Sequence, residues 1–246
     1  MIFYLGIDDT GKPGTTGTQE LAIELGRFLE SRTLARLTFV SAHPLLPATE
    51  IPGSSVNTAY CLTLESEKHR LRDLDMESRV YIMRNASAGA NAGFALVQAD
   101  AVTRRFLSFS QACRTLEMER RDALDLARES GIVIAGFTGS GKGVIGALAA
   151  VGWRWQGSDG TITWMPGLED LKGVMTLGEI FERCKLDYIK SIRGKTPLFD
   201  DRIRLGENPT PLLKTDRSLL LLEPAPRNAD WEWNAVGVSE AHRITW

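Results

Sequence analysis

The first residues of the sequence that could do chemistry are two adjacent carboxylates, Asp8 and Asp9, at the end of an apolar segment. Residues 2–7 are apolar and rich in β-formers, so we expect a strand that is buried on both faces. Open α/β sheets bind their ligands at the carboxyl ends of strands. Adjacent carboxylates repel each other unless a cation or a proton lies between them. This carboxylate pair therefore indicates a Mg²⁺ site facing phosphate oxygens, with a helix cap or a turn as the alternative role.

A second candidate is the glycine-rich stretch GFTGSGKG at residues 136–143, between a predicted strand at 132–135 and a predicted helix from Val144. Backbone N–H groups in such a loop, and the N-terminus of the helix that follows, attract anions. We therefore expect the loop to bind phosphate, with a structural turn as the alternative. The expected contacts come from Gly139, Ser140, Gly141, Lys142, Gly143 and Gly146.

The glycine-rich loop fits neither standard nucleotide motif in full. It nearly spells the pattern G-x-x-x-x-G-K-[ST], but Gly143 stands where a hydroxyl should hold Mg²⁺. Its last glycines also match the dinucleotide fingerprint, yet the nearest acids downstream, Asp159 and Glu169, fall in a predicted hairpin and a predicted loop. We expect a general anion-binding loop, for which the carboxylate pair supplies the missing metal ligands.

The composition limits the class of protein. Of the 246 residues, 43% are hydrophobic and 24% are charged, as in ordinary globular proteins. A net charge of −2 gives no global field to attract nucleic acid, so we expect no DNA partner, although a local basic patch is left open. No apolar run reaches the length of a membrane span, and the N-terminus lacks signal-peptide features. We therefore expect a cytoplasmic protein with no membrane partner.

Hydrophobic periodicity predicts the elements that position these residues. The expected helices cover residues 19–31, 65–84, 102–130 (as one helix or two) and 176–192, and the expected strands cover 2–7, 37–40, 56–64, 94–97 and 132–135. All six tryptophans follow residue 152, and residues 153–164 are typical of a β-hairpin. We therefore expect an α/β fold, with a mixed sheet and helices in a domain over residues 1–152 and a smaller α+β domain over residues 153–246.

Several motifs, taken in this order, resemble one enzyme family. They are Ile7-Asp8-Asp9-Thr10, a Gly/Thr loop ahead of Leu21-Ala22, Asn57-Thr58-Ala59, and the run from Gly141 through Gly143 and Gly146 to Ala150. In these positions the sequence is similar to the archaeal tRNA-isoleucine agmatinylcytidine synthetases. The resemblance implies a kinase-like, ATP-binding N-terminal domain followed by a ferredoxin-like domain. It also implies that ATP activates the C2 carbonyl of an anticodon cytidine, at which the amine of agmatine then reacts.

The resemblance assigns roles to individual residues. The carboxylate pair would act catalytically by binding Mg²⁺ on the triphosphate of ATP, and Asn57 and the glycine-rich loop would bind the nucleotide. Thr18 lies where the family has a threonine that receives phosphate, and Thr15 and Thr16 are further hydroxyls in the same loop. The alternative role of Thr18 is that of a helix N-cap.

The sequence also departs from the family pattern. Gly11 replaces an acid that usually follows Asp-Asp-Thr, and the cysteine before the family threonine is missing. The chain ends where the family continues into an oligonucleotide-binding fold and a zinc ribbon that grip tRNA. Cys61, Cys113 and Cys184 show no C-x-x-C spacing, so we expect reduced, mostly buried thiols and no zinc ribbon.

These observations predict a Mg-ATP-dependent enzyme that transfers a phosphoryl group or acts like a ligase. Its acceptor would be a small molecule in preference to a tRNA, because the RNA-binding domains of the family are missing. The alternative is a nucleotide- or metabolite-binding module without turnover, which Gly11 in place of an acid favours.

Overall fold

The computed structural model describes residues 1–12, 15, 17–46 and 57–237. The chain forms two compact units, Met1–Gln156 and Gly157–Trp246, which we describe separately. The expected boundary at residue 152 lies inside a helix of the first unit, α5 (Val144–Gln156). Gly152 is a point of close packing in that helix, since a Cβ atom there would lie 2.6 Å from the carbonyl oxygen of Phe106.

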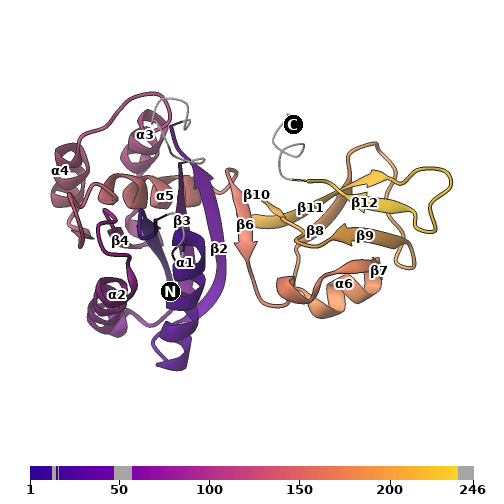
Figure 1. Ribbon diagram of the computed structural model, residues 1–246, viewed down its shortest axis with the longest axis horizontal. Coiled ribbons are helices and arrows are strands. Elements are labelled where there is room, and N and C mark those ends of the chain that lie inside the picture. Colours follow the sequence, from indigo (N-terminus) through magenta and orange to yellow (C-terminus); the bar gives the residue numbers. More distant parts are fainter. Residues whose placement is uncertain (13–14, 16, 47–56, 238–246) are drawn as a thin grey trace. The chain divides into compact units, whose positions relative to one another are not determined.

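The first unit is built on a sheet with the strand order β5-β4-β1-β3-β2 (Figure 1). Its strands are β1 (Ile2–Asp8), β2 (Arg36–Pro44), β3 (Thr58–Glu65), β4 (Gly93–Gln98) and β5 (Val133–Gly136). Each neighbouring pair in this order is antiparallel. Because β1 runs opposite to both of its neighbours, its carboxyl end lies beside the first residues of β3 and β4. Ile7 is opposite Tyr60, and Asp8 is opposite Gly93.

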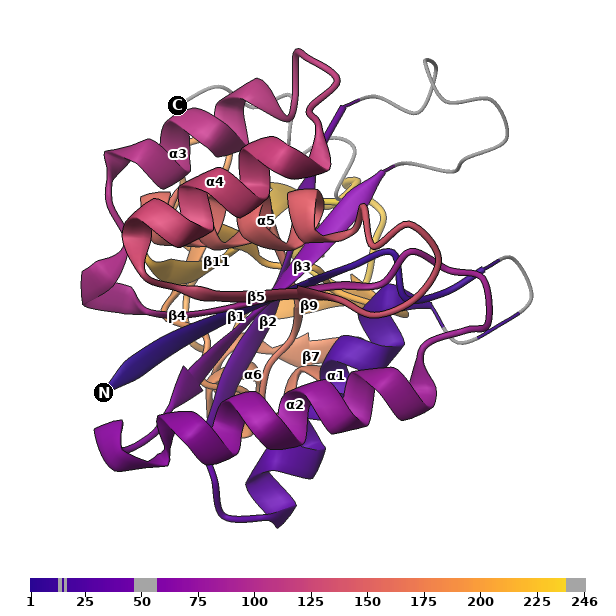
Figure 2. The same cartoon turned by 90° about the vertical axis from the view of Figure 1, so that its left-hand side faces the viewer.

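Helices cover both faces of this sheet (Figure 2). On one face lie α1 (Thr18–Ser31) and α2 (Leu71–Asn85), and on the other lie α3 (Arg104–Ala112), α4 (Arg120–Ser130) and α5. α5 is mostly apolar around its circumference and almost wholly buried, as a helix between a sheet and further helices must be. The segment expected as one helix or two forms two, because a capping box between Glu119 and Asp122 begins α4 separately.

The hairpin expected over residues 153–164 is wrong in its first half. Those first residues belong to the last turn of α5, and β6 (Thr161–Trp164) alone is a strand. The alternating Trp-Arg-Trp pattern resembles a strand, but here it continues the buried surface of a helix. Trp153 is 8% exposed, and the buried guanidinium of Arg154 lies 4.9 Å from the ring centroid of Tyr4. Packing against the core therefore overrides the local pattern.

The second unit combines short strands with one α-helix among its described residues. Its strand order is β6-β10-β11-β12-β9-β7, with β8 beside β11. The elements after β6 are β7 (Gly173–Thr176), α6 (Leu177–Arg183), β8 (Tyr188–Ser191), β9 (Arg202–Gly206), β10 (Leu212–Lys214), β11 (Arg217–Pro224) and β12 (Trp233–Ala235). β8 is parallel to β11, and β9 is parallel to β12. The helix expected over residues 176–192 is therefore wrong beyond α6, where β8 follows.

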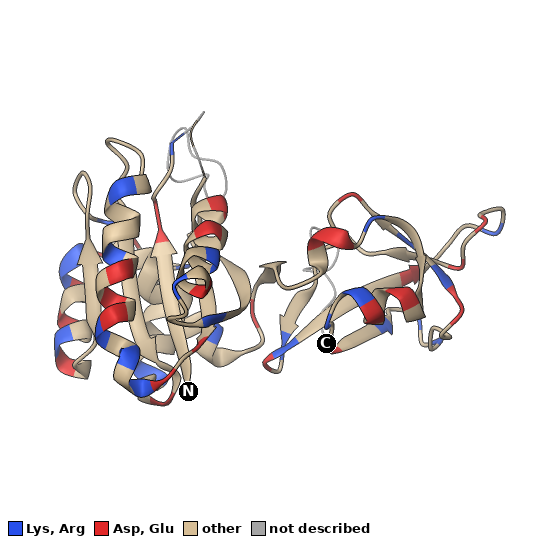
Figure 3. Cartoon of the chain, turned by 90° about the horizontal axis from the view of Figure 1, so that it is seen from below, with Lys and Arg blue, Asp and Glu red and all other residues tan. Residues whose placement is uncertain are grey.

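Over the described chain, strands pair in both senses and helices pack on the sheet of the first unit. This arrangement confirms the expected α/β class with a mixed, open sheet over the described chain. The mixed pairing was expected in the first unit, where all described neighbouring strands are antiparallel, and the parallel pairs lie in the second unit. Acidic and basic residues are mixed along the helices (Figure 3). Among the described residues, no helix is both long enough and apolar enough to cross a membrane. Cys61, Cys113 and Cys184 are free and buried, as expected.

Candidate functional site

The carboxylate pair lies at the carboxyl end of β1, and both side chains are partly buried. Asp9 has a φ of +50°, a left-handed conformation that is uncommon for residues other than glycine and recurs at functional sites. Burial, followed by the neighbouring charge of Asp9, raises the pKa of Asp8 from its ordinary value of 3.8 to about 8. The backbone N–H of Asp9 donates to Asp8 Oδ1 at 2.8 Å and opposes this shift. A cation between the two acids would remove the repulsion.

Two glycines of α5 and its preceding loop make room for Asp8. A Cβ atom at Gly146 would lie 2.0 Å from Asp8 Oδ2, so the carboxylate rests against the first turns of α5. A Cβ atom at Gly143 would lie 2.7 Å from the carbonyl oxygen of Asp8 and equally close to the amide nitrogen of Gly93. A serine or threonine at position 143 is therefore excluded by the backbone, which removes the G-x-x-x-x-G-K-[ST] interpretation of the loop. The dinucleotide interpretation fails as well, because β5 is antiparallel to β4 and the described strands of the first unit form no parallel βαβ unit.

Asn91 joins the carboxylate pair to the glycine-rich loop. Its Nδ2 donates to Asp9 Oδ2 at 3.0 Å, and its Oδ1 accepts from the backbone N–H and the hydroxyl of Ser140 at 2.9 and 2.8 Å. Its backbone carbonyl accepts from the N–H of Gly143 at 2.8 Å. Asn91 was not predicted to belong to the site, although it lies in a loop of small residues directly before β4. The antiparallel pairing of β4 with β1 brings that loop to Asp8.

The glycine-rich loop is held by hydrogen bonds inside the protein. The N–H of Gly141 donates to the carbonyl of Thr138, and the amides of Ser140 and Gly143 both donate to Asn91. Gly139 and Gly141 have φ values of 54° and 64°, which favour glycine. Since these amides are engaged, the exposed side chain of Lys142 is the more available phosphate contact.

A second cation lies close to the loop. Arg120, at the start of α4, has its Nε 3.5 Å from the position that a Cβ atom on Gly141 would occupy. Its side chain is exposed, so it can reach a ligand at the loop. Arg120 was not predicted, because nothing in its local sequence separates it from the other arginines of α4. Only the packing of α4 beside the loop identifies it.

Thr18 is the first residue of α1, and the N-cap of that helix is Gly17. The expected alternative role of Thr18 as an N-cap is therefore wrong. Its Oγ1 accepts a hydrogen bond from the N–H of Thr10 at 3.2 Å, and Thr10 directly follows the carboxylate pair. Among the described residues no side chain caps α1, and the first turn of a helix attracts anions.

The hydroxyl of Thr15 is already occupied. It accepts from the N–H of Lys12 and from the hydroxyl of Ser87, both at 2.7 Å, and donates to the carbonyl of Lys12 at 2.8 Å. Thr16 lies outside the described residues. Of the two described hydroxyls in this loop, that of Thr18 is therefore the better placed to react.

Asn57 immediately precedes β3, which places it at the same edge of the sheet as the end of β1. Its carbonyl accepts from the N–H of Leu45 at 2.9 Å, so its backbone fixes the approach to β3. The charge of Asp8 contributes to the pKa of two further side chains. Burial, followed by the charge of Asp8, raises the pKa of Tyr60. The same two causes raise the pKa of Cys113, in its case to about 12. Neither residue was predicted to belong to the site.

The carboxylates of Asp8 and Asp9 fit Mg²⁺ only if a phosphate supplies further oxygen ligands. Among the described residues, no three His, Cys, Asp or Glu side chains gather into a metal site. Magnesium commonly uses one or two carboxylates and takes its other ligands from water and phosphate. In addition, the buried hydroxyl of Thr10 lacks a hydrogen-bond partner among the described residues, as expected beside a site that receives a polar ligand. Two carboxylates, one of them with a raised pKa, and an unsatisfied hydroxyl together fit a metal–nucleotide complex.

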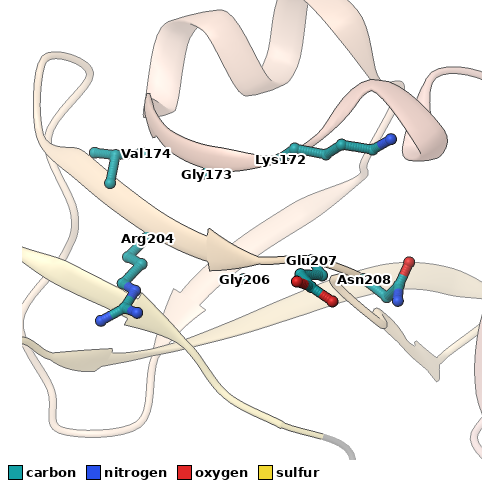
Figure 4. Close-up of a pocket in the computed structure, with 7 residues that line it drawn as sticks. All are labelled: Lys172, Gly173, Val174, Arg204, Gly206, Glu207 and Asn208. Carbon is teal, nitrogen blue, oxygen red and sulfur yellow. The ribbon is translucent and has the colours of Figure 1, made fainter.

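The second unit carries a groove of about 600 Å³ between the start of β7 and the end of β9 (Figure 4). Its charged lining side chains are Lys172, Arg204 and Glu207, which give it a mixed charge. None of the predicted site residues lines it. The groove and the site around Asp8 thus share no lining residue.

Solved structures resemble this chain. Apo TiaS, a tRNAIle2 agmatidine synthetase, is similar at 25% sequence identity and a TM-score of 0.53. The complex of TiaS with tRNA(Ile2) and ATP is similar at 26% and 0.55, and its complex with tRNA(Ile2), AMPCPP and agmatine at 26% and 0.54. Each match covers 62% of this chain, which spans 35–36% of the length of the TiaS chains. No protein-family model and no curated protein matches the chain. The similarity confirms a TiaS-like fold.

Proposed function

We propose that the chain binds Mg-ATP between the carboxylate pair and the glycine-rich loop, and uses it in an ATP-dependent, ligase-like or phosphoryl-transfer reaction. The observation that carries the proposal is the set of hydrogen bonds made by the Asn91 side chain. This side chain accepts from Ser140 and donates to Asp9, so it joins the carboxylate pair to the glycine-rich loop in a single site. Complexes of the similar TiaS structures with ATP and AMPCPP support the same ligand here.

Different residues of the site bind the metal ion, the phosphates and the rest of the nucleotide. Asp8 and Asp9 hold Mg²⁺, which when bound neutralises charge on the triphosphate and stabilises the transferred group. Lys142 and Arg120 contact the phosphates as exposed cations at the loop. Asn57 and the loop glycines lie beside the nucleotide at the same edge of the sheet. Water is displaced from the partly buried acids when the ligand binds, which strengthens each of these contacts.

Thr18 is proposed as the hydroxyl that receives phosphate or orients the reacting group. Its Oγ1 already meets the N–H of Thr10, one residue beyond the acids. The first turn of α1, which begins after the N-cap Gly17, would stabilise negative charge at the same point. Thr18→Val keeps the shape of the side chain and removes the hydroxyl, so it should reduce turnover more than nucleotide binding.

The acceptor is proposed to be a small molecule or an RNA. TiaS is recorded in complexes with tRNA(Ile2) and with agmatine, which are one member of each class. The match covers 62% of this chain and about a third of the TiaS chain, so the acceptor need not be shared. A second candidate function is a nucleotide-binding module without turnover. The observation in its favour is that the amides of Ser140, Gly141 and Gly143 are engaged within the protein.

Titration calorimetry with ATP, in the presence and absence of Mg²⁺, tests binding. We expect Mg-dependent binding by the wild type and at least about tenfold weaker binding by Asp9→Asn, since a metal ligand is lost. Asp125→Asn is the matched control, because it removes an acid from the exposed face of α4 where Asp125 pairs with Arg128. Equal affinity of Asp9→Asn and wild type would overturn the site.

Chromatography of the nucleotide products separates the two candidate functions. Incubation with Mg-ATP and an amine or RNA acceptor should produce AMP or ADP if the chain is an enzyme. Tight Mg-ATP binding without either product, across both acceptor classes, would support the binding module instead.

A further inference from the structure

Helix α2 carries an apolar stripe that the core of the first unit does not use. The inward side of the helix consists of three buried residues, Leu74, Ser78 and Ile82. On the outward side, Met76, Val80 and Met83 are 55%, 36% and 62% exposed. Their spacing of four and then three residues places them together on one side of the helix. A group of large apolar side chains exposed at this spacing is typical of a helix that packs against another surface.

A groove of about 450 Å³ adjoins this stripe at the start of α2. It is lined by residues 31–34, at the end of α1, and by Asp73, Met76 and Glu77 of α2. Arg32 Nη2 lies 3.6 Å from Glu77 Oε1, so these two charges compensate each other. Within the described part of the chain, no hydrogen bond or ion pair engages the carboxylate of Asp73. The groove therefore offers an apolar side chain, Met76, and an unpaired acid, Asp73.

An unpaired base lies near the other end of α2. Arg84 is exposed, and the described residues include no carboxylate paired with it. Asp73 and Arg84 are eleven residues apart, which is about three turns, so they flank the stripe on the same side. Arg79, by contrast, is already engaged, since its Nε donates to Asp75 Oδ1 at 2.6 Å and its guanidinium lies over the ring of Phe94.

We propose that α2 packs against α2 of a second copy of this chain, antiparallel and about a two-fold axis near Val80. In this register Met76 of each copy packs against Met83 of the other, and Val80 lies against Val80 of the second copy. Such an axis leaves each flank of the helix on its own side, so Asp73 of each copy meets Arg84 of the other. A parallel pair would instead bring the two acids together at one end and the two bases at the other, which is unfavourable.

The groove gives this contact a recess for the second copy. Met83 and Arg84 of the second copy would lie beside Met76 and Asp73, and the flexible side chains of methionine fill irregular recesses well. One helix face is a small interface, so we expect a weak dimer whose population rises with protein concentration. The inference goes beyond the proposed function, because it requires neither a nucleotide nor a metal ion.

Sedimentation velocity of the full chain without nucleotide, from about 5 to 500 µM, tests the proposal. The wild type should change from monomer to dimer over this range. Met76→Glu/Met83→Glu should raise the dimer Kd by at least about tenfold, because it places unpaired charges in the centre of the contact. Asp125→Arg is the control and should dimerise like the wild type, because α4 lies on the other face of the sheet.

Reversal of charge tests the antiparallel register. Asp73→Arg and Arg84→Asp should each raise the dimer Kd by about tenfold, because each sets like charges against one another. The double variant Asp73→Arg/Arg84→Asp restores opposite charges within its own dimer. An equal mixture of the two single variants restores them in a heterodimer. Both the double variant and the mixture should therefore dimerise like the wild type.

Three results would overturn the proposal, with folding checked by circular dichroism. The first is a wild type that remains monomeric throughout, and its binding to phosphatidylserine vesicles would then assign the stripe to a membrane surface. The second is a dimer that Met76→Glu/Met83→Glu does not weaken. The third is a mixture of the single charge variants that associates no better than either variant alone. If the methionine variant does not fold, the charge variants decide the question, and failure of Mg-ATP binding at Asp8 leaves the experiment unaffected.

Discussion

At the scale of single residues, the central feature is Asp8, whose ionised form is destabilised when no cation lies beside it. Burial and the charge of Asp9 raise the pKa of Asp8 to about 8. An ionised carboxylate in such surroundings lowers the stability of the folded protein. Residues that lower stability in this way are typical of functional sites. The cost is removed when a cation binds, so stability and ligand binding should respond in opposite directions to the same substitution.

Asp8→Asn should stabilise the unliganded protein above neutral pH. A raised folded-state pKa means that the folded protein holds the proton more tightly than the unfolded chain, so stability falls as pH rises from 3.8 to about 8. The amide cannot ionise and avoids this loss. Urea unfolding at pH 8 should give a gain on the order of 5 kcal/mol, and no gain near pH 4. An equal gain at both pH values, or in the control Asp125→Asn, would contradict the assignment.

Gly146→Ala should damage the site through a single methyl group. A Cβ atom there would lie 2.0 Å from Asp8 Oδ2, so the carboxylate or the helix must move. We expect a loss of about 1–3 kcal/mol in unfolding free energy, together with weaker Mg-ATP binding. Gly237→Ala is the control, since it lies in the second unit and no described atom lies within 4 Å of its Cβ position. If both variants bind Mg-ATP like the wild type, Asp8 is not held against α5 in the liganded state.

At the scale of elements, the direction of β1 relative to its neighbours determines which residues meet. The sequence located the strand, the acids and the glycine-rich loop, because apolar runs and glycine clusters are local signals. It did not reveal the antiparallel pairing, whereas ligand sites at the carboxyl ends of strands are typical of parallel sheets. Asn91 was missed for that reason, since it precedes β4 and reaches Asp9 only because β4 pairs with β1.

Asn91→Ala tests this cross-strand tie. It removes the bond to Asp9 Oδ2 and both bonds from Ser140, but leaves the backbone bond from Gly143 in place. We expect Kd for Mg-ATP to rise by about tenfold, as when a group that orients a ligand is removed. The control is Asn85→Ala, whose side chain donates to the carbonyl of Tyr81 within α2. A larger loss in the control than in Asn91→Ala would contradict the role of the tie.

Two elements of the fold could not be predicted because tertiary contacts decided them. Residues 153–156 alternate like a strand but complete α5, where Trp153 packs into the core and Arg114 lies 3.7 Å from its ring centroid. Residues 188–191 were expected in a helix, but they pair with β11 as β8. In both cases the hydrophobic periodicity of a short stretch of sequence fitted a helix and a strand about equally well. Contacts with distant parts of the chain then determined which of the two formed.

At the scale of the whole molecule, we propose that the first unit is an independent domain. Its core is continuous from β1 through α5, and it contains all of the constellation around Asp8. A fragment of residues 1–156 should unfold in one cooperative transition and be stabilised by Mg-ATP as the full chain is, as judged by circular dichroism during heating. A fragment that is unfolded, or folded but indifferent to Mg-ATP, would show that the site needs the second unit.

The most direct test of the account is a crystal grown with Mn²⁺ and a non-hydrolysable ATP analogue, examined by anomalous scattering at the manganese edge. We expect one manganese peak at about 2.2 Å from carboxylate oxygens of both Asp8 and Asp9, with the triphosphate extending toward Lys142. A metal and nucleotide found elsewhere, such as the groove lined by Lys172 and Glu207, would contradict it. So would a nucleotide bound at the loop with no metal at Asp8.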